Sequence, residues 1–331
     1  MTGFTEDELV EAIRKILSGP LPGVVLGPGD DAALVETGDP DRVGILTTDM
    51  LVEGVDFEPG MFSAHDLGYR ALVVNVSDVA AMAGSPRFGL VALGLPKDTE
   101  PAWVVELYGG LREAADEYAV ALVGGDLSSA SEVTISVTLT GEAPRGRAVT
   151  RSGASPGDRL VVTGRLGAAA GGLLVARQHH RDAGTNWGRE LLAALSRPVA
   201  RVGEGQTLAQ FGATAMIDVS DGLALDLWRL CRESAVGATV RLGDLPAALE
   251  LAHLVGVEPA DLVLHGGEDF ELLATLPPDT VDAATATLWE RFGTRLSAIG
   301  EVVEGSALTA IGLDGEAGPL EPKGWDHFAA Q

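Results

Sequence analysis

Hydrophobic and polar positions along the chain follow two different periods. Between residues 133 and 139, valine, isoleucine and leucine alternate with serine and threonine, which is the period of a strand with one buried face. Residues 63–83 contain no proline and place Leu67, Ala71 and Val74 on one face, which predicts a buried helix. Further helices are predicted at residues 5–17, 99–118 and 221–234, the first of them opened by the capping-box pattern Thr5-Glu6-Asp7-Glu8. Further strands are predicted at residues 43–48, 120–123, 160–163, 213–217, 270–276 and 296–303.

The segment between residues 144 and 158 interrupts this pattern. It is rich in Gly, Pro, Ser and Arg and has no apolar period, as expected for a connection between folded units. The chain has 331 residues, a length that favours two domains, so we predict a domain at 1–143, a linker at 144–158 and a domain at 159–331. Strands and long helices do not alternate strictly, which favours an α/β protein with mixed (α+β) sheets.

Composition and charge exclude several classes of protein. Hydrophobic residues make up 46% and charged residues 21%, which is ordinary for a globular enzyme and rules out disorder as the main state. The formal net charge of −25 argues against nucleic acid as a partner, because binding to a phosphate backbone relies on Lys and Arg. No apolar run reaches the roughly 20 residues of a membrane span, and the N-terminus has no apolar signal core. We therefore expect a cytoplasmic protein with no membrane partner.

Acidic residues stand repeatedly at the edges of apolar segments, usually beside Gly, Ser or Thr. Asp49 and Asp126 are predicted to end strands, and strand ends are where sites are built in such sheets. Clustered carboxylates repel unless cations lie between them, hard oxygen ligands favour Mg²⁺ or Ca²⁺, and glycines let backbone N–H groups approach phosphates. The pattern predicts a site for several Mg²⁺ ions and a polyphosphate; the alternative is that each residue caps a helix or forms a turn. The segments are Asp30-Asp31, Thr47-Thr48-Asp49, Asn75 to Asp78, Gly124-Gly125-Asp126, Asp218 to Gly222, and Gly266 to Asp269.

Other nucleotide and metal motifs are missing from the sequence. There is no G-x-x-x-x-G-K-[ST] phosphate loop, and no helix is predicted after Gly27-x-Gly29-x-x-Ala32, which disfavours a dinucleotide fingerprint. None of the six histidines has the H-E-x-x-H spacing of a zinc hydrolase, and the adjacent His179 and His180 are interpreted as a solvated helix end. The single cysteine, Cys231, excludes an internal disulfide.

A set of these segments, in this order, carries a resemblance to a known family. The segments are Gly29-Asp30-Asp31-Ala32-Ala33, Thr47-Thr48-Asp49-Met50-Leu51-Val52-Glu53-Gly54, Asp66-Leu67-Gly68-Tyr69-Arg70-Ala71-Leu72, Asn75-Val76-Ser77-Asp78, Gly124-Gly125-Asp126, Thr150-Arg151-Ser152-Gly153-Ala154, Ile217-Asp218-Val219-Ser220-Asp221-Gly222-Leu223 and Gly266-Gly267-Glu268-Asp269-Phe270-Glu271. Together they resemble thiamine-monophosphate kinases, from the superfamily that includes aminoimidazole ribonucleotide synthetase and selenophosphate synthetase. The resemblance extends from about residue 4 to the Gly324-Trp325-Asp326-His327-Phe328 tail.

The resemblance implies a two-domain fold like that of aminoimidazole ribonucleotide synthetase and a homodimer joined through the N-terminal sheets. The alternating strand at residues 133–139, which has an apolar face to bury, is a second reason to expect the homodimer. It implies that ATP, bound between the domains with several Mg²⁺ ions, gives its γ-phosphoryl group to thiamine monophosphate. By motif, Asp49, Asp126, Arg151 and Asp221 would be catalytic, and Tyr108, Gly125, Asp126, Arg151 and Ser220 would contact ATP. The metal ligands would be Asp31, Thr47, Thr48, Asp49, Asp78, Asp126, Asp218 and Asp221, and Glu268 and Trp325 would face the thiamine group.

One residue departs from the family pattern. Where the family usually has Glu-Gly-x-His-Phe, with the histidine contacting substrate, this chain has Glu53-Gly54-Val55-Asp56-Phe57. Asp56 is therefore a candidate substrate residue, and its effect on binding of the phosphate acceptor is left open. Two alternatives to the kinase remain: an ATP-using enzyme of the same superfamily with another acceptor, and a non-catalytic acidic protein that binds metal or nucleotide.

Overall fold

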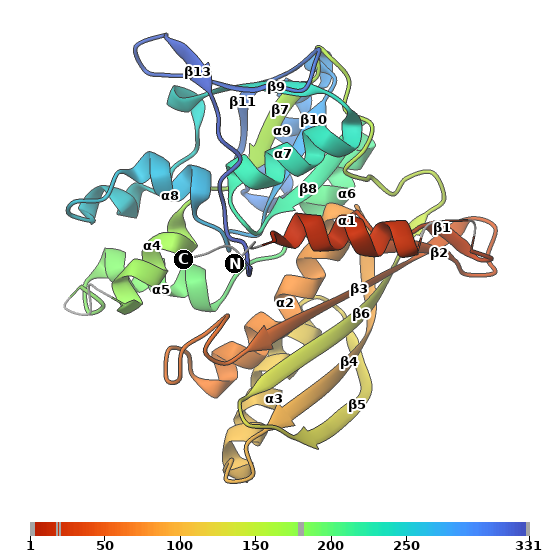
Figure 1. Cartoon of the computed structure of the whole chain (residues 1–331), viewed down its shortest axis with the longest axis vertical. Helices are drawn as coiled ribbons and strands as arrows, with labels where there is room; N and C mark the ends of the chain where they lie inside the picture. Colours follow the sequence, from red (N-terminus) through yellow and green to blue (C-terminus); the bar gives the residue numbers. More distant parts are fainter. Residues whose placement is uncertain (1–3, 18, 20, 178–181, 329–331) are drawn as a thin grey trace.

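The computed structural model describes residues 4–17, 19, 21–177 and 182–328, so the predicted helix end at His179 and His180 lies outside the described residues. Two sheets form two lobes, and helix α1 (Glu6–Ile16) lies between them (Figure 1). Thr5 and Glu8 form the reciprocal capping box that the sequence indicates at the start of α1. None of the described helices is both long and apolar enough to cross a membrane.

The N-terminal sheet has six strands in the order β1-β2-β3-β6-β4-β5. Only β4 and β5 are parallel, and helix α3 (Pro101–Glu117) makes the crossover between them; the other neighbours are antiparallel. The sheet is thus mixed, as predicted. Its strands are β1 (Val24–Leu26), β2 (Ala33–Glu36), β3 (Arg42–Val52), β4 (Ser85–Leu95), β5 (Ala121–Ser129) and β6 (Thr134–Pro144).

Helix α2 (Ala64–Ala81) is the predicted buried helix, and it packs against the inner face of this sheet. Its other sides are covered by α3 and by elements of the second lobe. The approach to α3 depends on glycine: a Cβ atom at Gly68 would lie 2.0 Å from the carbonyl oxygen of Leu107, and one at Gly110 would lie 1.7 Å from that of His65. Because α2 contacts both lobes, it can hold side chains from both around one site.

In the described part of the chain, no helix covers the outer face of the N-terminal sheet (Figure 1). Leu46, Met50, Phe88 and Leu90 are 41–57% exposed on β3 and β4. The apolar face that the sequence analysis found at residues 133–139 is a different one, since it is buried beneath α2 within the same chain. That face therefore gives no reason to expect a partner, whereas the outer face does.

The second sheet has seven strands in the order β13-β12-β9-β11-β7-β10-β8, and only β9 and β12 are parallel. Its strands are β7 (Arg159–Thr163), β8 (Ala215–Val219), β9 (Gly237–Arg241), β10 (Glu271–Leu276), β11 (Leu296–Val303), β12 (Leu308–Ile311) and β13 (Ala317–Pro319). Its helices are α4 (Ala168–Arg177), α5 (Asn186–Ser196), α6 (Val202–Gln210), α7 (Leu223–Ser234), α8 (Pro259–His265) and α9 (Val281–Phe292), with 3₁₀ turns at Leu242–Asp244, Leu249–His253 and Pro278–Thr280.

Two predicted strand ends that bear on site residues are wrong, and β6 also continues past residue 139 to Pro144. Strand β3 continues three residues past Asp49, and β5 continues past Asp126 to Ser129, so both aspartates lie inside strands. Polar residues in the strand interiors hid the continuation. Strand β4 was missed altogether because it contains a proline and two glycines and has apolar side chains on both faces. Residues 145–158, which include most of the predicted linker, contain no helix or strand.

Candidate active site

A cavity of about 600 Å³ lies between the lobes and collects most of the predicted site residues. Its walls come from β3, α2, β8, the loop before β10, α1 and the C-terminal tail. Residues far apart in the sequence meet here because α2 is packed between both sheets. Of the predicted residues, the cavity is lined by Asp31, Thr47, Thr48, Asp49, Asp56, Asp78, Arg151, Asp218, Ser220, Asp221, Glu268 and Trp325.

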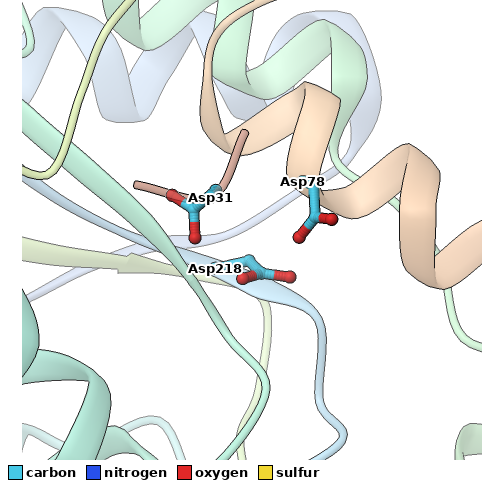
Figure 2. Close-up of side chains that lie close together, drawn as sticks. All are labelled: Asp31, Asp78 and Asp218. Carbon is cyan, nitrogen blue, oxygen red and sulfur yellow. The ribbon is translucent and has the colours of Figure 1, made fainter. Parts of the chain in front are cut away.

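Three aspartates from three different elements converge at the base of the cavity. Asp31 precedes β2, Asp78 is on α2 and Asp218 is on β8, and each offers a carboxylate oxygen within 4.8 Å of the others (Figure 2). Thr47 donates a hydrogen bond to Asp78, and the Ser77 hydroxyl donates to Asp218 at 2.6 Å. The Oδ2 atom of Asp31 is buried and has no hydrogen-bond partner among the residues that the structure describes. A buried acceptor without a donor, facing two more carboxylates, fits a hard divalent cation.

Burial and mutual repulsion raise the pKa of the carboxyl groups in this cluster. Burial, followed by the charge of Asp49, raises the pKa of Asp78 well above its ordinary value. Burial, followed by the charge of Asp31, does the same for the pKa of Asp218 and raises the pKa of Asp30 to about 7. Burial is also the main cause that raises the pKa of Asp49 to about 6. The folded chain therefore holds negative charge at an electrostatic cost that a bound cation would relieve.

These shifts predict how the stability of the metal-free protein depends on pH. A carboxyl group whose folded-state pKa is raised contributes stability that is complete below its unfolded pKa and is lost as pH rises through the folded value. For Asp49 and Asp30 the loss should fall between about pH 4 and pH 7. We expect the free energy of unfolding, measured with urea in EDTA, to fall as pH rises over this range. In Asp49→Asn the free energy of unfolding should fall less over the same range. If the free energy of unfolding of the wild-type protein in EDTA rose between pH 6 and pH 7, the raised pKa values of these carboxyl groups would be contradicted.

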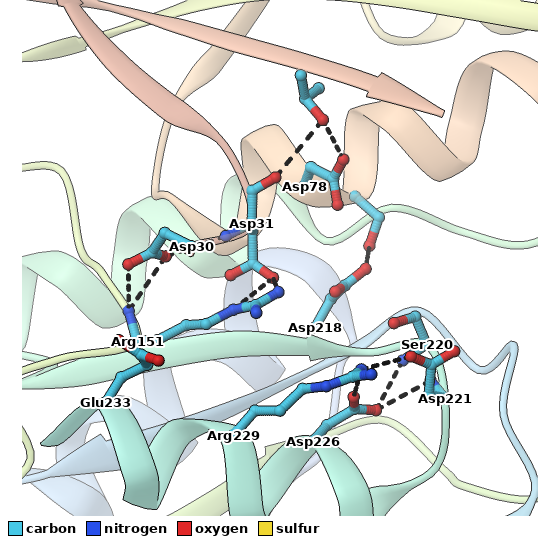
Figure 3. A network of polar contacts seen from close by, with 12 residues as sticks. Asp30, Asp31, Asp78, Arg151, Asp218, Ser220, Asp221, Asp226, Arg229 and Glu233 are labelled. Atoms are coloured by element: carbon cyan, nitrogen blue, oxygen red, sulfur yellow. Dashed lines mark hydrogen bonds and ion pairs between the residues drawn. The ribbon is translucent and has the colours of Figure 1, made fainter. Parts of the chain in front are cut away.

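Arg151 connects the linker segment to the Asp30-Asp31 turn. Its guanidinium group donates to Asp31 Oδ1 at 2.6 Å, and its backbone N–H donates to both oxygens of Asp30 at 3.2 and 3.0 Å (Figure 3). Both contacts lie on one side of the aspartate cluster. Arg151 therefore places a fixed positive charge beside the candidate metal site, where it can meet a phosphate oxygen.

Asp226 and Arg229 on α7 position the loop that bears Ser220 and Asp221, although the sequence analysis did not select them. One oxygen of Asp226 accepts hydrogen bonds from the backbone N–H groups of Ser220, Asp221 and Gly222 at 3.0–3.1 Å (Figure 3). Arg229 pairs with both Asp221 and Asp226. In the sequence the two residues form an ordinary i, i+3 pair of a helix surface, so only the fold distinguishes them.

The opposite end of the cavity combines an ion pair with aromatic rings. Arg70 on α2 is 1% exposed, pairs with Glu268, and donates to the carbonyl oxygen of Leu195 at 2.6 Å. The rings of Phe62 and Phe270 lie 5.8 and 5.6 Å from its guanidinium carbon. Glu268 and Phe270 have φ angles of +74° and +51°, an unfavourable conformation for residues with side chains, which is typical of functional sites. Arg70 belongs to the segment from Asp66 to Leu72 that carries the family resemblance, but it was not predicted as a site residue.

Trp325 and Asp56 also face this end of the cavity. The backbone N–H of Trp325 donates to the carbonyl oxygen of Asp221 at 2.9 Å, so the C-terminal tail is tied to the metal-site loop. Asp56 Oδ2 accepts a hydrogen bond from the N–H of Val52 at 2.7 Å, which closes the turn after β3. The residue that departs from the family pattern thus has a local structural contact while it lines the cavity.

Three predicted residues do not line the cavity of this chain: Tyr108, Gly125 and Asp126. Tyr108 is 37% exposed on α3, and Gly125 and Asp126 are exposed on the edge strand β5. Asp126 pairs with Ala92, Ala92 with Ser136, and Ser136 with Met50, so Asp126 and the cavity residue Met50 are separated by three strand spacings. Three spacings amount to about 14 Å, which is too far for Asp126 to share a metal ion with Asp49 of its own chain.

Two family models match the chain in tandem. The model described as "AIR synthase related protein, N-terminal domain" matches residues 29–143, and the model described as "AIR synthase related protein, C-terminal domain" matches residues 155–312. With an acidic cavity between two mixed sheets, the chain is a two-domain protein of the AIR synthase related class. Within that class the chain belongs to the thiamine-monophosphate kinase family, which confirms the resemblance and the fold class that the motifs indicated.

The relatives cover nearly the whole chain. Thiamine-monophosphate kinase of Escherichia coli (strain K12) is 37% identical over 92% of this chain and 93% of its own length, and that of Aquifex aeolicus (strain VF5) is 34% identical over 97% of each. A structure of AaThiL complexed with AMPPCP and TMP is 34% identical, has a TM-score of 0.86, and covers 98% of this chain and 97% of that one. E. coli HypE, a hydrogenase maturation protein, is 18% identical with a TM-score of 0.71, so that likeness shows the fold alone.

Proposed function

We propose that this chain is an ATP-dependent kinase that phosphorylates thiamine monophosphate to thiamine diphosphate in the cytoplasm. The observation that carries the proposal is the cluster of Asp31, Asp78 and Asp218, with its unpartnered buried oxygen, in a cavity between the lobes. The same fold in AaThiL was solved with AMPPCP and TMP together, which is the pair of ligands that a kinase of this kind needs.

Mg²⁺ ions suit this donor set because every side chain in the cluster offers oxygen. Bound metal would neutralise the repulsion between donor and acceptor phosphates and align them for in-line transfer. Arg151, fixed by Asp30 and Asp31, supplies a cationic contact for a phosphate oxygen. We propose Asp31, Thr47, Thr48, Asp49, Asp78, Asp218 and Asp221 as the metal ligands that one chain supplies.

The chemistry requires no general base. A phosphate monoester has a second pKa of about 6 and is largely ionised at neutral pH, so the attacking oxygen already carries charge. The thiazolium ring is a cation, and Glu268 with the rings of Phe270 and Trp325 offers a carboxylate and aromatic faces for it. Arg70, held by Glu268 and Leu195, fixes the position of that carboxylate.

We propose that the active form is a homodimer joined through the outer faces of the N-terminal sheets. The cavity opens toward that face at Thr48 and Met50, and the face is apolar and uncovered. Asp126 lies about 14 Å from Met50 of its own chain, in the same row across the sheet. In the proposed dimer each chain supplies Asp126, with Gly125 and Tyr108, to the cavity of its partner, so the predicted roles of these residues are retained in trans.

The proposed interface predicts a change in oligomeric state. We expect Leu90→Glu to give monomers in light scattering at micromolar concentration, because a charge would be buried in an apolar contact. Leu313→Glu is the matched control, since Leu313 is 89% exposed on the other lobe. A wild-type monomer, or dissociation of both variants alike, would defeat the proposal.

Asp56 gives a second prediction. An ionised Asp56 repels a phosphate, whereas a histidine can donate a hydrogen bond to it. We expect Asp56→His to keep activity, to lower or leave unchanged the KM for thiamine monophosphate, and to change the KM for ATP little. Loss of the bond from Val52 should cost about 1 kcal/mol of stability, which Asp56→Asn, with its amide oxygen, should retain. Complete loss of turnover in Asp56→His would count against the assignment of acceptor.

ATP turnover with and without thiamine monophosphate tests the proposed function and separates it from its alternatives. We expect ADP release that depends on both Mg²⁺ and thiamine monophosphate. Turnover that is stimulated only by another acceptor would favour a different ATP enzyme of the superfamily. Absence of turnover with retained nucleotide binding would favour a non-catalytic binding protein.

A further inference from the structure

A second cavity of about 610 Å³ lies in the C-terminal lobe, behind the substrate end of the first one. The two cavities share a wall, which is the segment between α8 and β10. Glu268 and Phe270 face the first cavity, whereas Asp269 and Glu271 line the second. The rest of the second cavity comes from the β7–α4 loop, the residues after α5, and the end of α9 with the loop that follows it.

The carboxylates in the second cavity are already compensated by protein groups. Glu271 forms a two-point ion pair with Arg201, at 2.5 and 2.7 Å, and accepts a hydrogen bond from Thr163. Asp269 accepts hydrogen bonds from the backbone N–H groups of Gly167 and Ala169. Neither carboxylate therefore needs a cation from solution.

Two arginines in the same cavity are less fully compensated. Arg295 forms no ion pair with any described residue. Arg165 forms one long ion pair, with Glu250 at 4.0 Å, and its own side chain is 52% exposed. Their backbones are close at the sheet end, because the N–H of Gly164, the residue before Arg165, donates to the carbonyl oxygen of Arg295 at 2.8 Å, and both arginines line the cavity. In a chain with a net charge of −25, one unpaired and one loosely paired guanidinium group at one cavity form an unusual site for an anion.

Two aromatic rings from α9 complete the lining. Trp289 is 66% exposed and Phe292 is 37% exposed, although both line the cavity. Exposed aromatic rings in the same cavity as these two arginines provide a stacking surface next to an anion site. We propose that this cavity binds a phosphorylated small molecule that carries a planar ring, with phosphate on Arg165 and Arg295 and the ring on Trp289. The site is separate from the kinase cavity and does not rest on the proposed function.

The two cavities can be told apart by omitting metal. In EDTA the carboxylates of the first cavity are not neutralised and repel an anion, whereas the second cavity needs no metal. The five tryptophans, labelled as 5-fluorotryptophan, give separate ¹⁹F signals, and Trp289→Phe identifies that of Trp289. We expect ADP in EDTA to shift this signal with a dissociation constant at or below about 1 mM. Inorganic pyrophosphate should bind more weakly than ADP, and adenosine should bind weakest.

Substitution tests the assignment of the anion contact. We expect the double variant Arg165→Ala/Arg295→Ala to weaken ADP binding at least about tenfold, since two charge-assisted contacts are lost. Arg147→Ala, which removes an exposed arginine outside both cavities, should bind ADP like the wild type. An unshifted Trp289 signal, equal affinity for adenosine and ADP, or wild-type affinity in the double variant would each overturn the proposal.

Discussion

Replacing Asp218 by asparagine is expected to lower kinase turnover about 100-fold or more and, at the same time, to stabilise the metal-free protein. The rate falls because one charged ligand is lost from a transfer that depends on electrostatic stabilisation. The stability rises because the charge repulsion of residue 218 with Asp31 and Asp78 is removed.

Steady-state assays and urea unfolding in EDTA and in Mg²⁺ measure the two effects separately. In wild type, Mg²⁺ should raise the unfolding free energy, because the metal binds only the folded cluster. In Asp218→Asn this gain should be reduced. Asp116→Asn is the matched control, since Asp116 is exposed on α3 and should change neither quantity. Turnover near that of wild type at matched Mg²⁺, or a less stable metal-free variant, would remove the metal-site interpretation.

Mixed dimers should recover activity that neither parent retains. If Asp126 acts in the partner's cavity, a dimer of one Asp126→Asn chain and one Asp218→Asn chain has one cavity with both aspartates and one with neither. We expect each homodimer to lose about 100-fold or more in rate and the mixed dimer to show about half the wild-type rate. Two affinity tags allow the mixed dimer to be purified.

A second pair of variants provides the control for this experiment. Asp78 and Asp218 lie in the cavity of the same chain, so a mixed dimer of Asp78→Asn and Asp218→Asn has no intact cavity. We expect that dimer to stay as inactive as its parents. An Asp126→Asn/Asp218→Asn dimer that is equally inactive would place Asp126 in its own chain's site and would contradict the proposed arrangement.

Local sequence signals predicted the parts of this fold that depend on local rules. The Thr5 capping box, the proline-free helix α2 and the strand β11 at residues 296–303 were all found from spacing and residue type. Strand β4 was not, because a central strand with glycines and apolar side chains on both faces has no alternation to detect. The apolar face at residues 133–139 is buried by α2 and not by a partner subunit; an alternating pattern shows that one face is buried, but not what buries it.

The residues of the candidate site were also predictable from the sequence only in part. Aspartates beside glycine and serine were visible as candidate ligands, and most of them meet in the cavity. Arg70, Asp226 and Arg229 were not predicted as site residues. A single arginine in an apolar helix and an i, i+3 pair of charges are common, and only the tertiary contacts of these residues place them at the site. The position of Asp126 also required the structure, since the strand register that separates it from Met50 is a property of the sheet.

The measurement that tests the central claim most directly is ³¹P NMR of the wild-type protein with ATP, thiamine monophosphate and Mg²⁺. The account predicts that signals of thiamine diphosphate and ADP grow in equal amounts, that the thiamine monophosphate signal declines with them, and that EDTA stops all three changes. If ADP and inorganic phosphate accumulate instead while the thiamine monophosphate signal stays constant, the cavity hydrolyses ATP without using this acceptor, and the proposed function is wrong.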